Sequence, residues 1–177
     1  MTRVGSQLTF CSPQRILRRT VVEKDEQNII TRFFSLDDGN AESEQTLFFD
    51  GIISAGIISI KQNIPVLNPE NFISNYNYFD LSENLSVSEI IPTDKPLVLG
   101  FGTVTTNEIN KLLPQFTLAL KAFSIYEIIA AYTFYPALML GQKAGLVENM
   151  HTRLLLWENA DLVNKCLTFS TKIRDVS

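Results

Sequence analysis

Histidine, the side chain on which metal-dependent hydrolysis most depends, occurs once in this sequence. A hydrolytic metal centre needs several histidine and carboxylate ligands together with an acid/base group. The one histidine, His151, follows Glu148 and Asn149, and no residue beside it would pair with it as a nucleophile requires. We therefore predict no metal site, no catalytic residue and no cofactor, and we expect His151 to lie on the surface or in a loop.

Two other short patterns could carry chemistry. Lys61 lies two residues before Asn63 on a predicted strand, and a buried amine there could lose its proton and form a Schiff base with a carbonyl compound. The simpler interpretation is that Lys61 points to solvent. Gly100 and Gly102 lack the third glycine and the βαβ setting of a dinucleotide-binding fingerprint, so the sequence predicts no phosphate loop.

The charge balance argues against nucleic acid as a partner. The net charge is −4, whereas phosphate binding needs clustered lysine and arginine. The one basic cluster, Arg15, Arg18 and Arg19, is short and is followed by acidic residues, which favours a solvated strand end over a phosphate site. Cys11 and Cys166 lie far apart in sequence, and we expect two reduced thiols in a cytosolic protein.

The hydropathy pattern predicts no membrane partner. The longest apolar stretch, residues 125–140, contains Glu127 and Pro136 and is too short to span a bilayer. The N-terminus carries no apolar run of signal-peptide length. We expect a cytoplasmic protein.

The elements that would position these residues begin with a hairpin. Residues 16–23 and 29–36 are rich in β-branched side chains and flank a polar turn, which predicts an antiparallel pair with a positive φ at Asn28. Residues 46–49 predict a short strand that ends in a turn at residues 50–51.

Two further strands are predicted from apolar runs without alternation, residues 57–60 and 97–101, as in strands buried on both faces. Residues 65–96 lack periodicity and predict a long irregular connection with a short helix near residues 69–75. We expect its aromatic side chains to cover the core. They are Phe72, Tyr76, Tyr78 and Phe79.

The second half of the chain predicts helices. Asn107 is expected to cap a helix that Pro114 kinks or breaks. Ser124 and Glu127 form a capping-box pattern before an apolar helix, and Pro136 is expected to end that helix and open another.

The last predicted elements follow a helix stop. Gly141 or Gly145 is expected to end the second short helix. Residues 153–158 and 165–174 are then predicted to close the chain as strands.

Residues 50–63 resemble the part of a metal-dependent amidohydrolase that leads from its β-sandwich into its α/β barrel. The family pattern is Pro-Gly-aliphatic-aliphatic-x-x-His-x-His, and its two histidine positions are Lys61 and Asn63 here. Residues 99–107 resemble the last barrel strand, whose metal-binding aspartate position is Gly102. A protonated lysine cannot ligate a metal ion, and glycine has no side chain to offer. The resemblance thus implies a relative that has lost its metal centre.

Residues 124–176 resemble the last helix of that family and its return into the β-sandwich, with Tyr135 where the family has asparagine. Between Asn63 and Leu97 the chain has room for one βα unit where the family has six. The first and last strands of a closed barrel are neighbours. The resemblance therefore implies that residues 57–60 and 97–101 lie side by side in parallel.

We expect a single α+β domain over residues 1–177. Residues 1–56 and 145–177 would form a composite β-sandwich from both chain ends. Residues 57–144 would form a barrel remnant, made of the first and last barrel strands and the C-terminal helices. The sandwich would pack on this remnant.

The function that follows is that of a non-catalytic pseudoenzyme related to the amidohydrolases, acting by binding or by self-association. Its partner would be a second copy or a full-length amidohydrolase relative. One alternative is a small-molecule binding module at the former active-site mouth around Lys61, Asn63 and Thr103. Another is a residual hydrolase of C–N bonds.

Overall fold

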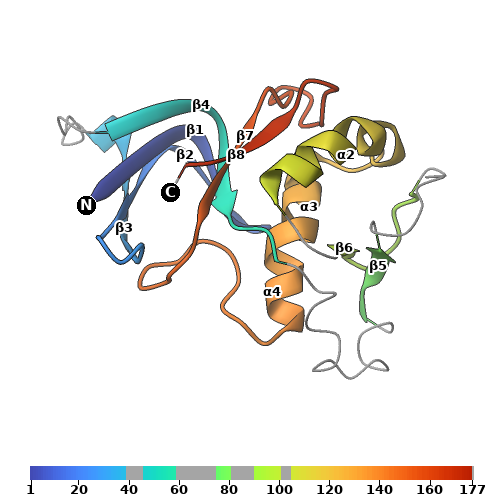
Figure 1. Ribbon diagram of the computed structural model, residues 1–177, viewed down its shortest axis with the longest axis horizontal. Helices are drawn as coiled ribbons and strands as arrows, with labels where there is room; N and C mark the ends of the chain where they lie inside the picture. Colours follow the sequence, from blue (N-terminus) through green and yellow to red (C-terminus); the bar gives the residue numbers. More distant parts are fainter. Residues whose placement is uncertain (39–45, 59–74, 81–89, 101–104, 177) are drawn as a thin grey trace.

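Strands from both ends of the chain lie side by side in one six-stranded sheet (Figure 1). The strands are β1 (Thr2–Ser12), β2 (Arg15–Lys24), β3 (Ile30–Ser35), β4 (Thr46–Ala55), β7 (Leu154–Glu158) and β8 (Lys172–Asp175). Their order in the sheet is β3-β2-β1-β4-β7-β8, and only β1 and β4 pair in parallel. This computed structural model describes residues 1–38, 46–58, 75–80, 90–100 and 105–176.

The predicted N-terminal hairpin is confirmed. β2 and β3 pair antiparallel, and Asn28 has φ +62°. The Asp25 carboxylate accepts hydrogen bonds from the backbone N–H groups of Gln27 (2.8 Å) and Ile29 (2.9 Å). Aspartate commonly closes turns in this way, so the polar turn residues fix the hairpin locally.

The predicted turn at Asp50 and Gly51 is instead a bulge within a continuous β4. The β1–β4 register shifts between Ser6 and Leu8, so that one β1 residue faces both Asp50 and Gly51. Gly51 has φ +142°, and a Cβ there would collide with the backbone oxygen of Trp157. Glycine is therefore favoured at position 51 by the backbone of the bulge and by the close approach of β7 to β4.

The six strands form one curled sheet, which corrects the expectation of a two-sheet sandwich. The N–H of Ile30 in β3 donates to the Met150 carbonyl (3.0 Å), and the N–H of Asn149 donates to the Ile30 carbonyl (2.8 Å). β3 at one sheet edge thus meets the segment before β7. The curl encloses a buried cluster made of Val4, Cys11, Val22, Ile30, Ile53, Ala55, Leu146, Leu154 and Leu156.

Helix α2 (Thr106–Ala119) is capped by Thr105 and not by Asn107 as predicted. The Thr105 hydroxyl accepts the N–H of Glu108 (3.3 Å), and the Glu108 carboxylate accepts the N–H of Thr105 (3.1 Å). This reciprocal pair satisfies two backbone donors at the helix start, which asparagine at 107 could not do with the residues that follow it.

Helix α2 also continues through Pro114, which we expected to kink or break it. Proline in a helix interior removes one hydrogen bond and costs about 3 kcal/mol. Ile109, Leu113 and Phe116 lie on both sides of it and are buried in the core. Each such buried side chain contributes about 1.5–3 kcal/mol, so tertiary packing outweighs the local cost.

A second helical stretch consists of α3 (Ile125–Ile129), the π-helical turn η3 (Ala130–Phe134) and α4 (Tyr135–Met139). The predicted capping box before it is confirmed. The Ser124 hydroxyl accepts the N–H of Glu127 (3.3 Å), and the Glu127 carboxylate accepts the N–H of Ser124 (2.7 Å).

Pro136 lies in the first turn of α4, as predicted, although the helical stretch is not interrupted before it. Proline has no N–H to donate to the carbonyl of Tyr132 four residues earlier. That carbonyl accepts a hydrogen bond from the N–H of Ile58 (3.2 Å). The chain that leaves β4 is thereby tied to the helices.

Gly141 ends α4, with φ +66°. The N–H of Gln142 donates to the Ala137 carbonyl (2.9 Å), and the N–H of Gly141 donates to the Leu138 carbonyl (3.0 Å). These two bonds define a Schellman motif, which favours glycine at this position. Of the two glycines that the sequence offered, Gly141 is the helix stop.

A small parallel sheet pairs β5 (Asn77–Asp80) with β6 (Leu97–Gly100). The strand predicted near residues 97–101 is confirmed for β6, but its described partner β5 lies in a segment that we expected to be irregular. Ile57 and Ile58 belong to no strand, so the predicted pairing of residues 57–60 with β6 is not found for them. The rest of residues 57–60, and residues 69–74 of the predicted short helix, lie outside the described residues.

The C-terminal strand is shorter than predicted. Of residues 165–174 only the end belongs to β8, and the part before it is a loop held by turns. β8 is fixed to α2 because the Asn110 side chain donates to the Ile173 carbonyl and accepts from the Ile173 N–H, both at 2.7 Å. The Asn110 amide thus satisfies the backbone groups of Ile173 that a neighbouring strand would otherwise bond.

A second buried cluster lies between the sheet and the helices. Trp157 is fully buried there, and its Nε1–H donates to the Ser54 hydroxyl (2.9 Å). Its ring centre lies 6.0 Å from that of Tyr132 in η3. The α+β class is confirmed. Among the described helices, none has the length and apolar character needed to cross a membrane.

Candidate functional site

The positions that the resemblance assigned to the lost metal ligands lie outside the described residues. They are Lys61, Asn63 and Gly102, and Thr103 lies there too. In the described part of the chain, no three His, Cys, Asp or Glu side chains are grouped so that they could hold a metal ion.

A small cavity lies between described residues that flank these segments in the sequence. Its volume is about 170 Å³, and Ile57, Thr105 and Asp175 are among the residues that line it. Ile57 precedes the segment that contains Lys61, and Thr105 follows the segment that contains Gly102. Tertiary structure therefore brings together two sequence regions that the resemblance relates to each other.

His151 lies at the surface, and the two cysteines do not form a disulfide. His151 is exposed and forms an isolated bridge with Ile29, as expected for a surface residue. Cys11 and Cys166 are both free thiols. Burial raises the pKa of the Cys11 thiol to about 11, although the Arg15 charge acts in the opposite direction. The Cys11 thiolate, the nucleophilic form, is thus disfavoured.

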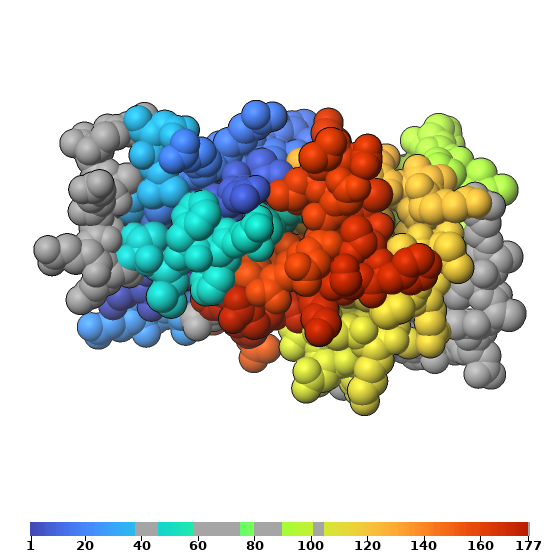
Figure 2. Space-filling view, turned by 90° about the horizontal axis from the view of Figure 1, so that it is seen from above, coloured from blue at the N-terminus to red at the C-terminus, as the bar shows by residue number. Residues whose placement is uncertain are grey.

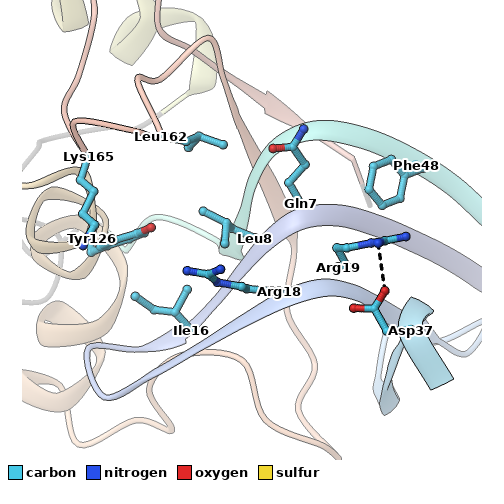
Figure 3. A pocket seen from close by; sticks show the side chains of 10 residues that line it. All are labelled: Gln7, Leu8, Ile16, Arg18, Arg19, Asp37, Phe48, Tyr126, Leu162 and Lys165. Atoms are coloured by element: carbon cyan, nitrogen blue, oxygen red, sulfur yellow. Dashed lines mark ion pairs between the residues drawn. The ribbon is translucent and has the colours of Figure 1, made fainter.

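The main candidate site is a groove between the sheet and the helical layer, with a volume of about 910 Å³ (Figure 3). Strands β1 and β2, helix α3 and the loop between β7 and β8 all contribute side chains to it. The residues that line it are Gln7, Leu8, Ile16, Arg18, Arg19, Asp37, Phe48, Tyr126, Leu162 and Lys165. We call this feature the basic groove.

The apolar floor of the basic groove belongs to the protein core. Leu8, Ile16 and Leu162 are partly buried and pack against the cluster between sheet and helices, as does Tyr126. A floor that is held by the core is preformed. Small-molecule sites typically combine such an apolar surface with a few placed polar groups.

The loop that carries Lys165 is held in place by backbone hydrogen bonds. The Lys165 carbonyl accepts the N–H of Ile125 (2.7 Å), and Asp161 and Cys166 exchange two backbone bonds of 3.0 Å each. Lys165 itself has φ +55°. These contacts place the lysine beside the start of α3, from which Tyr126 also reaches the groove.

Arg18 and Arg19 both face the groove because the strand alternation fails between them. Neighbouring strand residues normally point to opposite faces, but Arg19 has φ +44° and both arginines are exposed. Arg19 forms an ion pair with Asp37 (3.0 Å), drawn in Figure 3. Arg18 forms no ion pair with any residue that the structure describes.

The arginine cluster is exposed, as expected for a solvated strand end, and two of its three members also line the basic groove. Arg18 and Arg19 line the groove with Lys165, whereas Arg15 lies over the Phe33 ring, 5.6 Å from its centre. Three cations and one carboxylate from the described part of the chain therefore line this groove, whereas the net charge of the whole chain is −4. Lys165 is remote in sequence, so no local signal could have joined it to the arginines.

Lys24 follows the predicted strand over residues 16–23 as the first residue of the polar turn, but it is fully buried at the end of β2. Its ammonium makes no hydrogen bond to any described residue. Burial lowers the pKa of Lys24, while the charges of Asp175 and Asp25 act to raise it. Lys24 does not line the basic groove, so we expect its burial to affect the stability of the protein and not the binding of a ligand.

Comparison with known proteins leaves the family open. No family model matches the chain, and no curated protein matches it. One solved structure, an N-acetyl-D-glucosamine-6-phosphate deacetylase from Mycobacterium smegmatis, is similar at 9% identity over 69% of this chain, with a TM-score of 0.26. The match covers 30% of that structure. This weak likeness leaves the amidohydrolase resemblance as a hypothesis based on the residues.

Proposed function

We propose that this chain is a non-catalytic binding protein whose ligand occupies the basic groove. The observation that supports this best is the combination of a preformed apolar floor with cations supplied by distant segments. The floor can bury the body of a ligand, and the cations can orient it. This proposal relocates the binding module that the sequence suggested around Lys61, Asn63 and Thr103.

The side chains in the groove support binding more than catalysis. Among the described residues, the groove lining contains no histidine or cysteine, and its one carboxylate, Asp37, is paired with Arg19. A general base needs a free group within reach of the substrate. The resemblance adds a second argument, because Lys61, Asn63 and Gly102 stand where its metal ligands would be.

Filling the groove is expected to abolish binding. In a thermal-shift screen of purines, pyrimidines, cyclic amides and aromatic acids, compounds that stabilise the wild type should not stabilise Leu162→Trp. Val163→Trp is the matched control, because Val163 is adjacent, 89% exposed and outside the groove lining. Stabilisation that persists in Leu162→Trp would contradict the groove assignment, and zinc-dependent turnover of amide, lactam or aminohydrolase substrates would contradict the non-catalytic role.

Self-association is a second candidate function, favoured by one half of β4. β7 pairs only with Ile52–Ala55, so the beginning of β4 is paired on one side, with β1, and has no described strand on its other side. Leu47 and Phe48 are 61% and 49% exposed there, and Figure 2 shows β4 at the surface beside the C-terminal strands. Exposed apolar strand edges pair readily with another chain.

Changing Leu47 to lysine is expected to reduce self-association, because a charge at a strand edge opposes pairing with another strand. Light scattering over a range of protein concentrations would show a dimer for the wild type and a monomer for Leu47→Lys. Leu118→Lys is the matched control, since Leu118 is 63% exposed on α2. A monomeric wild type at every concentration would exclude this function.

A further inference from the structure

We infer that the ligand of the basic groove is a small organic anion, with a carboxylate or phosphate group on an apolar body. This inference rests on the proposed function and adds the chemical class of the ligand. Arg18 and Lys165 supply the charge, and the Tyr126 hydroxyl supplies a further hydrogen-bonding group.

The two cations that would bind the anion have no counter-ion among the described residues. Neither Arg18 nor Lys165 forms an ion pair there, whereas Arg19 is already paired with Asp37. In Figure 3 the Arg18 guanidinium and the Tyr126 hydroxyl point toward the same part of the groove from opposite sides. A guanidinium presents paired N–H donors that match the two oxygens of a carboxylate or a phosphate.

The apolar body of the ligand would lie on the floor of the groove. Leu8 and Ile16 flank Arg18 in Figure 3, and Leu162 lies across the groove from Ile16. An anion without an apolar body would leave this surface exposed to water. We therefore expect the free inorganic anion to bind more weakly than an anion that carries an apolar group.

The charges around the groove favour a small anion over an extended polyanion. Asp37 lies at the end of the groove occupied by Arg19 and Phe48 (Figure 3). A polyanion that extended beyond Arg18 in that direction would meet Arg19, whose charge is already neutralised by this carboxylate, on a chain whose net charge is −4. A single acid group at Arg18 needs no further cation at that end of the groove.

Four probes separate the contributions to binding: 1-naphthoate, 1-naphthyl phosphate, neutral 1-naphthol and inorganic phosphate, each titrated by calorimetry at neutral pH. We expect at least one naphthyl anion to bind about tenfold more tightly than naphthol, since a charge-assisted hydrogen bond is worth about that factor. The two naphthyl anions distinguish a carboxylate ligand from a phosphate ligand. Inorganic phosphate alone should bind more weakly than naphthyl phosphate.

Arg18→Gln should lower the affinity for the naphthyl anion about tenfold and leave the affinity for naphthol unchanged. Arg15→Gln is the matched control, because Arg15 belongs to the same strand and carries the same charge but does not line the groove. Asp37→Asn should strengthen anion binding by up to about fivefold, because it removes a carboxylate and releases Arg19.

The outcomes separate the two proposals. If naphthol binds as tightly as the anions and Arg18→Gln changes nothing, the ligand class is wrong while the groove remains a binding site. If inorganic phosphate binds as tightly as naphthyl phosphate, the inference that the ligand carries an apolar body is wrong. If none of the four probes binds the wild type, the groove is not a ligand site and both proposals fail.

Discussion

Replacing Trp157 with alanine is expected to lower the free energy of unfolding by about 3–5 kcal/mol, the range for a large aromatic removed from a core. Trp157 is fully buried between β7 and the helices, where it contacts the cluster that joins the sheet to the helical layer. Its removal would leave a cavity at that contact and would break the bond to the Ser54 hydroxyl. Both effects lower the free energy of unfolding.

Urea unfolding followed by far-UV circular dichroism would measure this change, because the variant lacks the single tryptophan needed for a fluorescence signal. Trp157→Phe retains most of the ring volume, loses the bond to Ser54 and should show a smaller loss of stability than Trp157→Ala. Phe169→Ala is the control, since Phe169 is 63% exposed, and it should change stability by less than about 0.5 kcal/mol. Equal effects of Trp157→Ala and Phe169→Ala would contradict the packing described.

Replacing Lys24 with methionine is expected to stabilise the protein by about 1–3 kcal/mol at neutral pH. The Lys24 side chain is fully buried, and its ammonium has no hydrogen-bond partner in the described part of the chain. Burying a polar group without a partner costs free energy, whereas methionine has similar length and no charge. Lys172→Met, at an exposed position of β8, is the matched control and should be close to neutral.

The same lysine predicts a dependence of stability on pH. Its pKa is lowered in the folded protein by burial, so between that pKa and the unfolded value of about 10.4 the unfolded state binds more protons. Through this window the Lys24 contribution makes the folded protein more stable as pH rises. Below the folded pKa both states are protonated, and the contribution is constant.

Urea unfolding of the wild type and of Lys24→Met at several pH values would isolate this contribution, because other groups titrate in both proteins. The stability difference between them should shrink as the pH rises toward about 10. A constant difference would show that the Lys24 ammonium is solvated in the folded state. A wild type more stable than Lys24→Met at neutral pH would show that Asp175 or Asp25 offsets the cost of burial.

Local features of the fold were well predicted where neighbouring residues settle them. The hairpin turn at Asn28, the capping box at Ser124 and the stop at Gly141 each rest on hydrogen bonds or on φ preferences within a few residues. Such bonds join residues that are near neighbours in the chain. The sequence pattern was therefore sufficient for these elements.

Predictions failed where a distant contact outweighed a local preference. Gly51 is typical of a turn, but the close approach of the Trp157 backbone makes it part of a bulged strand. Pro114 is typical of a helix end, but the core holds the helix on both sides of it. In each case the deciding atoms lie far away in sequence.

The sequence by itself determined the α+β class, the strands other than β1 and β5, the main helices, the near absence of histidine and the acidic net charge. Only the tertiary structure placed Arg18 and Lys165 on one groove, buried Lys24 and joined the strands of both chain ends in one curled sheet. The physical reason is the range of the interactions. Caps, turns and side-chain alternation act between near neighbours, whereas grooves, buried charges and sheet order arise from contacts between residues remote in the chain.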